Sequence, residues 1–550
     1  MVAFSFLRGV FLARALASSP AATGGALLPV RSASPTSGSV NTYLPIEDIS
    51  PINIPADPED GIRDGPENLR LRLVVPSPPT PEMPALVNRS LHLNGQDWYL
   101  TELFMTPDNA ATFPNYTATS YRWYDGRLPN PFFDGFLMSN LTLPSLESTM
   151  RNSPHDAFWI DCFSIPAEPP LKGKILDLLP NIFSAASEVI VPLGLNSRST
   201  LPLIAGNADL TNTPAADLEA AILDIDQEQW VRSIWTYKES MNAKRYIFTD
   251  RSWTDGAAAS TNEPQVADIQ FFKRVAEGLM IYSKSQNWTD YETFEKLPNV
   301  DGLVNIGLDR QLSGATYSRS VFQSLSSLDR RFVESDKNFF WGLYGAITEQ
   351  AVPEGRSSTL SDLYGFFFEV CETKNDFSFI YTTAERSTIP GKTFYPAQGQ
   401  IHSILTWATD GNYQTANITD EGIKLDGMVT LEQKTALGQR GQNFIADWFA
   451  SGIPENAGNG GNASVVSKVL KIIQMIGFTG SGDPIFTEDG IFFPQWVVPS
   501  SNAVDIPTVL VTSQLGWPFG SPGFAKVKGQ YVPGAFIGHV AAQEARTILM

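Results

Sequence analysis

The segment AFWIDCFSIPAEPPLKGKILDLLPNIFSAASEVIVPLG, residues 157–194, contains the plainest structural pattern of this chain. Apolar runs at its two ends, AFWIDCF (157–163) and EVIVPLG (188–194), are typical of buried strands. Between them, residues 171–187 have the apolar spacing of a helix. A strand, a helix and a second strand in this order predict a βαβ unit with two parallel strands.

The same alternation continues on both sides of this segment. Further strands are expected at WYLTELF (98–104), YTATSYRW (116–123) and RYIFT (245–249), and further helices at 144–151, 215–224 and 228–243. Strands that alternate with helices favour a mostly parallel sheet covered on both faces. The sequence therefore predicts an α/β domain over residues 97–255.

The rest of the chain differs from residues 97–255 in composition and in hydrophobic pattern. Residues 1–46 contain arginines but no acidic residue, which indicates a disordered tail or a targeting segment. Prolines crowd residues 47–96, which we interpret as a linker or a strap over the first domain. Helical patterns dominate residues 256–454, and residues 455–550 are expected to form one helix followed by Pro/Gly-rich strands.

Composition narrows the classes of function. The 550 residues carry a net charge of −19, which disfavours binding to nucleic acid. Two cysteines cannot form a disulfide framework, and four scattered histidines have no metal-ligand spacing, so no metal site is expected. Since no apolar run reaches 18 residues, no membrane span is expected. We predict a cytoplasmic protein, with mitochondria as the alternative location because of the arginines near the N-terminus.

The predicted helix 228–243, EQWVRSIWTYKESMNA, contains the candidate chemistry. At about 100° per residue, an apolar stripe faces the core; it consists of Trp230, Ile234, Tyr237 and Met241. Arg232 and Glu239 lie on the opposite side, and Trp235 lies between the two faces. The helix pattern alone favours a solvated Arg and Glu on an ordinary amphipathic helix over a functional site.

Four short motifs in order resemble the fungal HET (heterokaryon incompatibility) domain. They are Tyr116-Thr-Ala118-Thr-Ser120-Tyr121-Arg-Trp123, Trp159-Ile160-Asp161, the segment from Phe183 to Gly194, and Trp230-Val-Arg232-Ser-Ile-Trp235-Thr-Tyr-Lys238-Glu239. The likeness covers roughly residues 97–250. This chain departs from the family pattern at Tyr124, Ser164, Pro166-Ala167 and Lys238.

The resemblance implies a remote relationship to TIR domains, which are flavodoxin-like α/β modules of cell-death signalling, some of which cleave NAD. It implies that Glu239 is the catalytic carboxylate and that NAD is a substrate, with no bound cofactor. A carboxylate can stabilise an oxocarbenium-like centre, and an aromatic ring can stack on a base. Trp123, Asp125, Asp161, Arg232 and Trp235 are the expected substrate-binding residues.

Two mechanisms and one other class of protein remain open. The implied function is non-self recognition and programmed cell death, either by nucleotide cleavage or by a catalytically silent module that self-associates or binds another incompatibility protein. The alternative is a secreted or organellar structural glycoprotein without catalytic activity. Six N-x-S/T sequons keep this alternative open.

Overall fold

The computed structural model describes residues 68–550 with internal gaps. The gaps are residues 124–125, 167–168, 207–208, 252–265, 289–292, 294–295, 313–319, 330, 332, 334, 349–358, 389–392, 398–400, 407–409, 412, 450–456, 499–506, 518 and 528. The prediction for residues 1–46 therefore lies outside the described residues.

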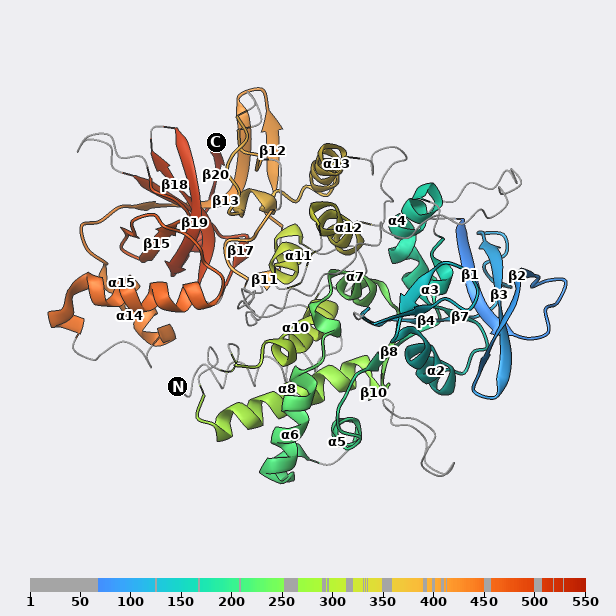
Figure 1. Ribbon diagram of the computed structural model, residues 1–550. Coiled ribbons are helices and arrows are strands. Elements are labelled where there is room, and N and C mark those ends of the chain that lie inside the picture. Colours follow the sequence, from blue (N-terminus) through green and yellow to red (C-terminus); the bar gives the residue numbers. More distant parts are fainter. Residues whose placement is uncertain are drawn as a thin grey trace.

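An eight-stranded sheet forms the N-terminal part (Figure 1). Its strands are β1 (Leu69–Pro76), β2 (Ala85–Leu93), β3 (Gln96–Met105), β4 (Thr117–Thr119), β7 (Phe158–Trp159), β8 (Glu188–Leu193), β9 (Tyr246–Asp250) and β10 (Val266–Ala267). Their order across the sheet is β10-β9-β8-β4-β7-β1-β3-β2. The four neighbours β9, β8, β4 and β7 are parallel.

The other four strands of this sheet make it mixed rather than mostly parallel. Strands β1, β3 and β2 pair antiparallel beyond β7, and β10 pairs antiparallel with β9. The linker or strap predicted for residues 47–96 is therefore wrong for 69–76 and 85–93, which are strands. The alternation LRLRLVV favours a strand because it places Leu69, Leu71 and Leu73 on one face. Arg70 and Arg72 face the other way and pair with Glu102 of β3.

Helices cover both faces of the parallel strands. The elements of this part are α2 (Thr142–Asn152), α3 (Asp161–Ser164), α4 (Pro169–Ala185), α5 (Thr200–Ala205), η2 (Leu210–Asn212) and α6 (Ala215–Asp226), with the short hairpin β5 (Arg127–Pro129) and β6 (Leu137–Ser139). Trp159 packs with Ile182 of α4 in the main core, whereas Phe158 packs with Leu146 of α2 in a second core. The opposite directions of two successive strand residues explain this division.

The single helix predicted for 228–243 is two elements, η3 (Trp230–Arg232) and α7 (Ile234–Asn242). Ser233 has extended backbone angles between them, and its hydroxyl accepts a hydrogen bond from the Trp235 amide as the N-cap of α7. The predicted apolar stripe is nevertheless buried, because Trp230 packs from η3 into the same core as Ile234 and Met241.

Beyond residue 267 the chain is helical and then forms a second sheet. The helices are α8 (Asp268–Ser285), α10 (Pro298–Leu312), α11 (Val321–Leu328), α12 (Asp336–Ile347), α13 (Leu360–Thr373), η4 (Ser378–Tyr381), α14 (Gln439–Phe449), α15 (Ala457–Met475) and η5 (Ala542–Glu544). The strands are β11 (Asp410–Gly411), β12 (Ala416–Thr419), β13 (Gly422–Glu432), β14 (Ile485–Phe486), β15 (Gly490–Pro494), β16 (Thr508–Thr512), β17 (Leu515–Gly516), β18 (Gly520–Val527), β19 (Gln530–Gly538) and β20 (Arg546–Leu549).

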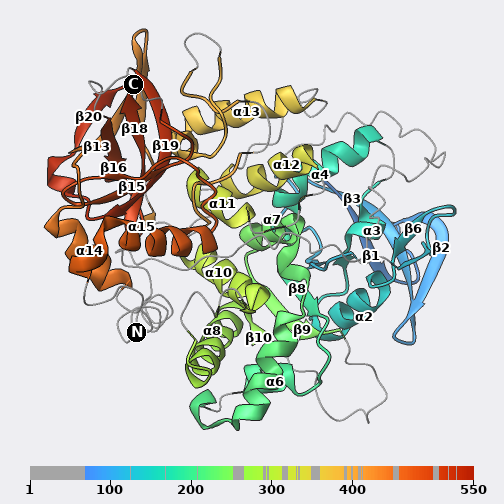
Figure 2. The ribbon, with the colours of Figure 1, turned by 60° about the vertical axis from the view of Figure 1, so that its left-hand side comes forward.

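The second sheet joins two segments that the sequence places in different regions. Strands β12 and β13 lie before residue 454, yet β13 pairs antiparallel with β16 and β20. A boundary between 454 and 455 would therefore divide one sheet. The two large sheets lie at opposite ends of the molecule with helices between them, as both ribbon views show (Figures 1 and 2).

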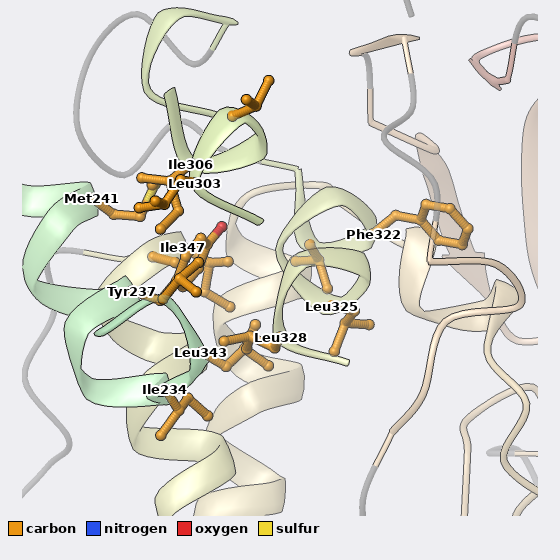
Figure 3. Close-up of a cluster of buried hydrophobic side chains, with 14 of the residues drawn as sticks. Ile234, Tyr237, Met241, Leu303, Ile306, Phe322, Leu325, Leu328, Leu343 and Ile347 are labelled. Atoms are coloured by element: carbon orange, nitrogen blue, oxygen red, sulfur yellow. The ribbon is translucent and has the colours of Figure 1, made fainter. Parts of the chain in front are cut away.

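The central helices pack around α7. Tyr237 and Met241 of α7 meet apolar side chains of α10, α11 and α12 in one buried cluster (Figure 3). Helix α12 comes close because Gly342 lies against Ile234 and Gly345 lies against the aliphatic stem of Lys238. The Asn242 amide donates to the Gly345 carbonyl oxygen at 2.7 Å. The region after residue 267 is thus packed onto the first domain rather than tethered to it.

Substitution of Gly345 tests this packing. A methyl group at residue 345 would overlap the buried stem of Lys238, so Gly345→Ala is expected to cost about 1–3 kcal/mol of unfolding free energy. Denaturant unfolding of the full chain measures this loss. Gly365→Ala on α13 is the matched control, because a Cβ there meets no atom within 4 Å. The control should be neutral or slightly stabilising, and an equal loss in both variants would contradict the packing argument.

Candidate active site

Two carboxyl side chains lie near the carboxyl ends of adjacent parallel strands. Ser120 directly follows β4 and contacts Glu239, and Asp161 follows the end of β7 by two residues. Open α/β sheets commonly bind ligands at this edge, because the loops that leave parallel strands meet there. We therefore describe Glu239, Asp161 and their partners as the candidate site.

Asp161 is held by three donors. The Tyr121 hydroxyl and the Cys162 amide donate to Oδ1 at 2.8 and 2.6 Å, and the Trp123 indole nitrogen donates to Oδ2 at 2.5 Å. Burial raises the pKa of Asp161 to about 6, against the opposing effect of these hydrogen bonds. The sequence places Asp161 inside a strand, but β7 ends at Trp159 and Asp161 begins the short helix α3.

Glu239 projects from α7 toward the end of β4. The Ser120 hydroxyl donates to its Oε2 at 2.5 Å, and the residue is only 9% exposed. Burial raises the pKa of Glu239 to about 8; the Ser120 hydrogen bond lowers it, the charge of Asp161 raises it and the charge of Lys238 lowers it. The prediction of a solvated face around Glu239 is therefore wrong, because the helices after residue 267 enclose α7.

Lys238, which departs from the family motif, is buried, and nothing in the sequence predicts its burial. Its Nζ donates to the Leu176 carbonyl oxygen of α4 at 3.0 Å, and its side chain is almost fully enclosed. Burial lowers the pKa of Lys238 to about 8, while the charges of Asp177 and Glu239 act in the opposite direction. The site helix thus holds an acid and a base side by side in the interior.

The other predicted site residues lie in different surroundings. Trp123 touches Asp161, and the guanidinium of Arg127 lies 5.3 Å from the centre of its ring. Trp235 packs partly buried, with the Lys238 Nζ 5.8 Å from its ring centre. Arg232 is exposed on η3 and donates to the Asn299 side chain of α10 at 2.7 Å. Asp125 lies outside the described residues.

Ser120, Tyr121 and Trp230 belong to the site although sequence analysis assigns them no role in it. All three stand within the motifs quoted for the family resemblance. A hydroxyl directly after an apolar strand is a signal for Ser120 and Tyr121, since residues at that position reach the ligand edge of a sheet. No sequence spacing could show that Ser120 meets Glu239, because 119 positions separate them.

The arrangement supplies one acid and one base function at neutral pH. Two carboxyl groups with pKa values near 6 and 8 differ in protonation at neutral pH, with Asp161 mostly ionised and Glu239 mostly protonated. Such a difference is typical of acid–base pairs in active sites. In the part of the chain that the structure describes, no group of three His, Cys, Asp or Glu side chains is arranged to hold a metal ion.

Comparisons with known proteins identify no relative. No family model matches the chain, and neither a curated protein nor a solved structure is significantly similar to it. Within the described ranges, none of the helices has the length and apolar character needed to cross a membrane.

The buried carboxyl of Glu239 predicts a pH-dependent effect on stability. Its pKa is near 4.5 in an unfolded chain and about 8 in the fold, so the folded state loses stability as pH rises through that interval. Glu239→Gln removes the titration and keeps the shape. Wild type should therefore lose stability between pH 5 and pH 8 while Glu239→Gln does not. The unfolding free energy of the variant minus that of wild type should increase over this interval by on the order of 1–3 kcal/mol.

Thermal or urea unfolding at the two pH values measures this increase. Glu421→Gln is the control, because Glu421 is exposed in a turn. An equal difference from wild type at pH 5 and pH 8 for Glu239→Gln would show that Glu239 does not titrate in this interval.

Proposed function

We propose that this chain is a HET-like protein of fungal non-self recognition and programmed cell death, and that it acts by cleaving NAD at Glu239. The observation that carries the proposal is a pair of carboxyls, the buried Glu239 and the half-buried Asp161, beside the carboxyl ends of parallel strands. Both are held by residues of the segment that follows β4. These are the residues that the family motifs mark.

The order of the parallel strands supports a flavodoxin-like or TIR-like reading of this domain. In chain order the four strands are β4, β7, β8 and β9, and across the sheet they lie as β7-β4-β8-β9. The first strand thus lies between the second and the third, as in the flavodoxin-like doubly wound order. The order in which the chain adds strands to the sheet reverses between β4 and β8. Ligands of such folds bind at the point of reversal, which here lies beside the segment that contains Ser120.

The chemistry of NAD cleavage suits the side chains of this site. Nicotinamide is a good leaving group because its ring carries a positive charge in NAD, so no acid is needed to expel it. An ionised Glu239 would stabilise the positive charge that develops on the ribose as the bond to nicotinamide breaks. A water molecule then bonds to the same ribose carbon and loses a proton, which leaves ADP-ribose and free nicotinamide as products. Arg122 and Arg127 follow β4 and offer positive charge to a diphosphate.

The proposed reaction depends on ionisation of Glu239. With a pKa of about 8, this carboxyl is mostly protonated at pH 7 in the free protein. A bound nicotinamide cation favours the ionised form, because an opposite charge close to a carboxyl lowers its pKa. Cleavage at limiting NAD should therefore increase from pH 6 to pH 8.

Nicotinamide release from NAD is the direct test. The full chain at high concentration should release nicotinamide, and Glu239→Gln should reduce the rate at least 100-fold, because it removes the charge that meets the cationic centre. Glu421→Gln should retain the wild-type rate. Release that is equal in wild type and Glu239→Gln would contradict a catalytic role for Glu239.

A catalytically silent signalling module is the second candidate. The observation that favours it is the 9% exposure of Glu239, with a neighbouring lysine where the family motif has glutamine. In this case the protein acts by self-association or by binding another incompatibility protein. Cell killing that persists in Glu239→Gln, with no nicotinamide release by assembled wild type, would select this candidate.

A structural glycoprotein is the alternative of another class. The sequon residues Asn88, Asn115, Asn140, Asn287 and Asn417 are all exposed. Exposure is common for asparagine, so it does not by itself favour glycosylation. Mass spectrometry of the protein from its natural host decides the matter: glycans on Asn140 and Asn417 select the glycoprotein, and unmodified peptides from both sites reject it.

A further inference from the structure

We propose that Ser120 is the positioning residue of this site and that Trp230 fixes the direction in which its hydroxyl points. The Trp230 indole donates to the Ser120 oxygen, and the Ser120 hydroxyl donates its proton to Glu239. Ser120 thereby holds one carboxyl oxygen of Glu239 and favours the ionised form. The catalytic consequence rests on the proposed function, whereas the effect on Glu239 itself does not.

The direction of the hydrogen bonds follows from the chemistry of tryptophan. The Trp230 Nε1 lies 2.9 Å from the Ser120 Oγ, which lies 2.5 Å from the Glu239 Oε2. An indole nitrogen can donate but cannot accept, so the serine oxygen must be the acceptor of this first bond. The one proton of Ser120 is then available to the carboxylate of Glu239.

The three partners come from firmly packed parts of the fold. The Ser120 amide donates to the Ile190 carbonyl oxygen of β8 at 2.9 Å, and Ser120 is fully buried. The Trp230 ring packs edge-on against Tyr246 and Phe248 of β9, at centroid distances of 6.1 and 6.0 Å. The hydroxyl therefore has little freedom to turn away from Glu239.

The second oxygen of Glu239 is not engaged by Ser120. Ser120 holds Oε2, and no described residue makes a hydrogen bond to Oε1. Oε1 is not among the buried polar atoms that lack a partner, so part of the 9% exposure of Glu239 belongs to this oxygen. The arrangement leaves one oxygen of a fixed orientation for a ligand.

Other charges around α7 also act on Glu239 and must be separated from the effect of Ser120. Asp161 of α3 raises its pKa and Lys238 of α7 itself lowers it. Asp177 of α4 acts on Lys238. Arg310 and Arg331 contact other parts of the α7 region, through carbonyl oxygens of Ser240, Ala243 and Val231. None of these contacts changes when the Ser120 hydroxyl alone is removed.

The test is a titration of the Glu239 carboxyl in the full chain. Infrared difference spectra between wild type and Glu239→Gln, recorded over a pH series, isolate the signal of this one group. For the Ser120→Ala variant, the reference is the double variant Ser120→Ala/Glu239→Gln. The titration midpoint of Glu239 should move upward by about one pH unit in Ser120→Ala, because a hydrogen bond to the charged form is lost. Trp230→Phe should move it in the same direction by a smaller amount.

Ser148→Ala is the matched control, because Ser148 is equally buried but its hydroxyl bonds to Thr249. Its titration midpoint should remain at the wild-type value. An unchanged midpoint in a folded Ser120→Ala variant would overturn the proposal. If Ser120→Ala does not fold, the midpoint in Trp230→Phe decides in its place, and an unchanged value overturns the proposal.

Nicotinamide release separates this inference from the proposed function. If wild type cleaves NAD, the pH profile of the rate should move upward in Ser120→Ala together with the titration midpoint. A profile that stays in place while the midpoint moves would reject the catalytic part of the inference. If wild type releases no nicotinamide, the proposed function fails, and the titration still decides whether Ser120 controls the protonation of Glu239.

Discussion

Helix α7 has almost no face open to water, and much of the structure depends on this enclosure. Helices α4, α10 and α12 pack against it, and Figure 3 shows apolar side chains of α10, α11 and α12 gathered beside those of α7. Lys238, Glu239, Ser240 and Asn242 are all nearly inaccessible to solvent. Burial of so many polar groups is costly unless they find partners. Lys238, Glu239 and Asn242 find theirs in the distant residues Leu176, Ser120 and Gly345. The enclosure therefore ties the two halves of the chain to each other through hydrogen bonds as well as through apolar contacts.

The same enclosure gives the site its electrostatic character. Burial raises the pKa values of Glu239 and Asp161, so both hold protons more tightly than free carboxyls do, and it lowers the pKa of Lys238, which holds its proton less tightly. The hydrogen bonds from Ser120, Tyr121 and Trp123 oppose this effect at the two acids. The pKa of Glu239 is thus a balance between desolvation, to which the helices packed on α7 contribute, and the hydrogen bond from Ser120, which follows β4. A change in the packing of α12 would alter this balance without touching the donors.

Local patterns predict the parallel strands and most helices, since apolar runs such as EVIVPLG have few alternatives. Local patterns fail where contacts with residues far away in the sequence determine the structure. The strand LRLRLVV is missed because prolines nearby favour a linker, although Glu102 on β3 pairs with its arginines. Helix 228–243 is predicted whole because periodicity does not reveal that Ser233 caps a new helix. Glu239 is predicted from its motif, but its burial is not, since that requires Gly342 and Gly345 to admit α12 about 100 positions away.

The buried charges on and beside α7 affect the pKa of Glu239 more clearly than they stabilise the fold. A fold gains little stability from a buried ion pair, and apolar residues of similar volume often serve as well or better. Lys238 nevertheless packs its stem against Gly345, where any side chain would displace it, so the fold is built around the lysine. Its charge lowers the pKa of Glu239, as the Ser120 hydroxyl also does, whereas burial and Asp161 raise it. These opposing influences leave the pKa of Glu239 at about 8, so the carboxyl can gain or lose a proton near neutral pH. The proposed reaction through Glu239 requires a balance of this kind.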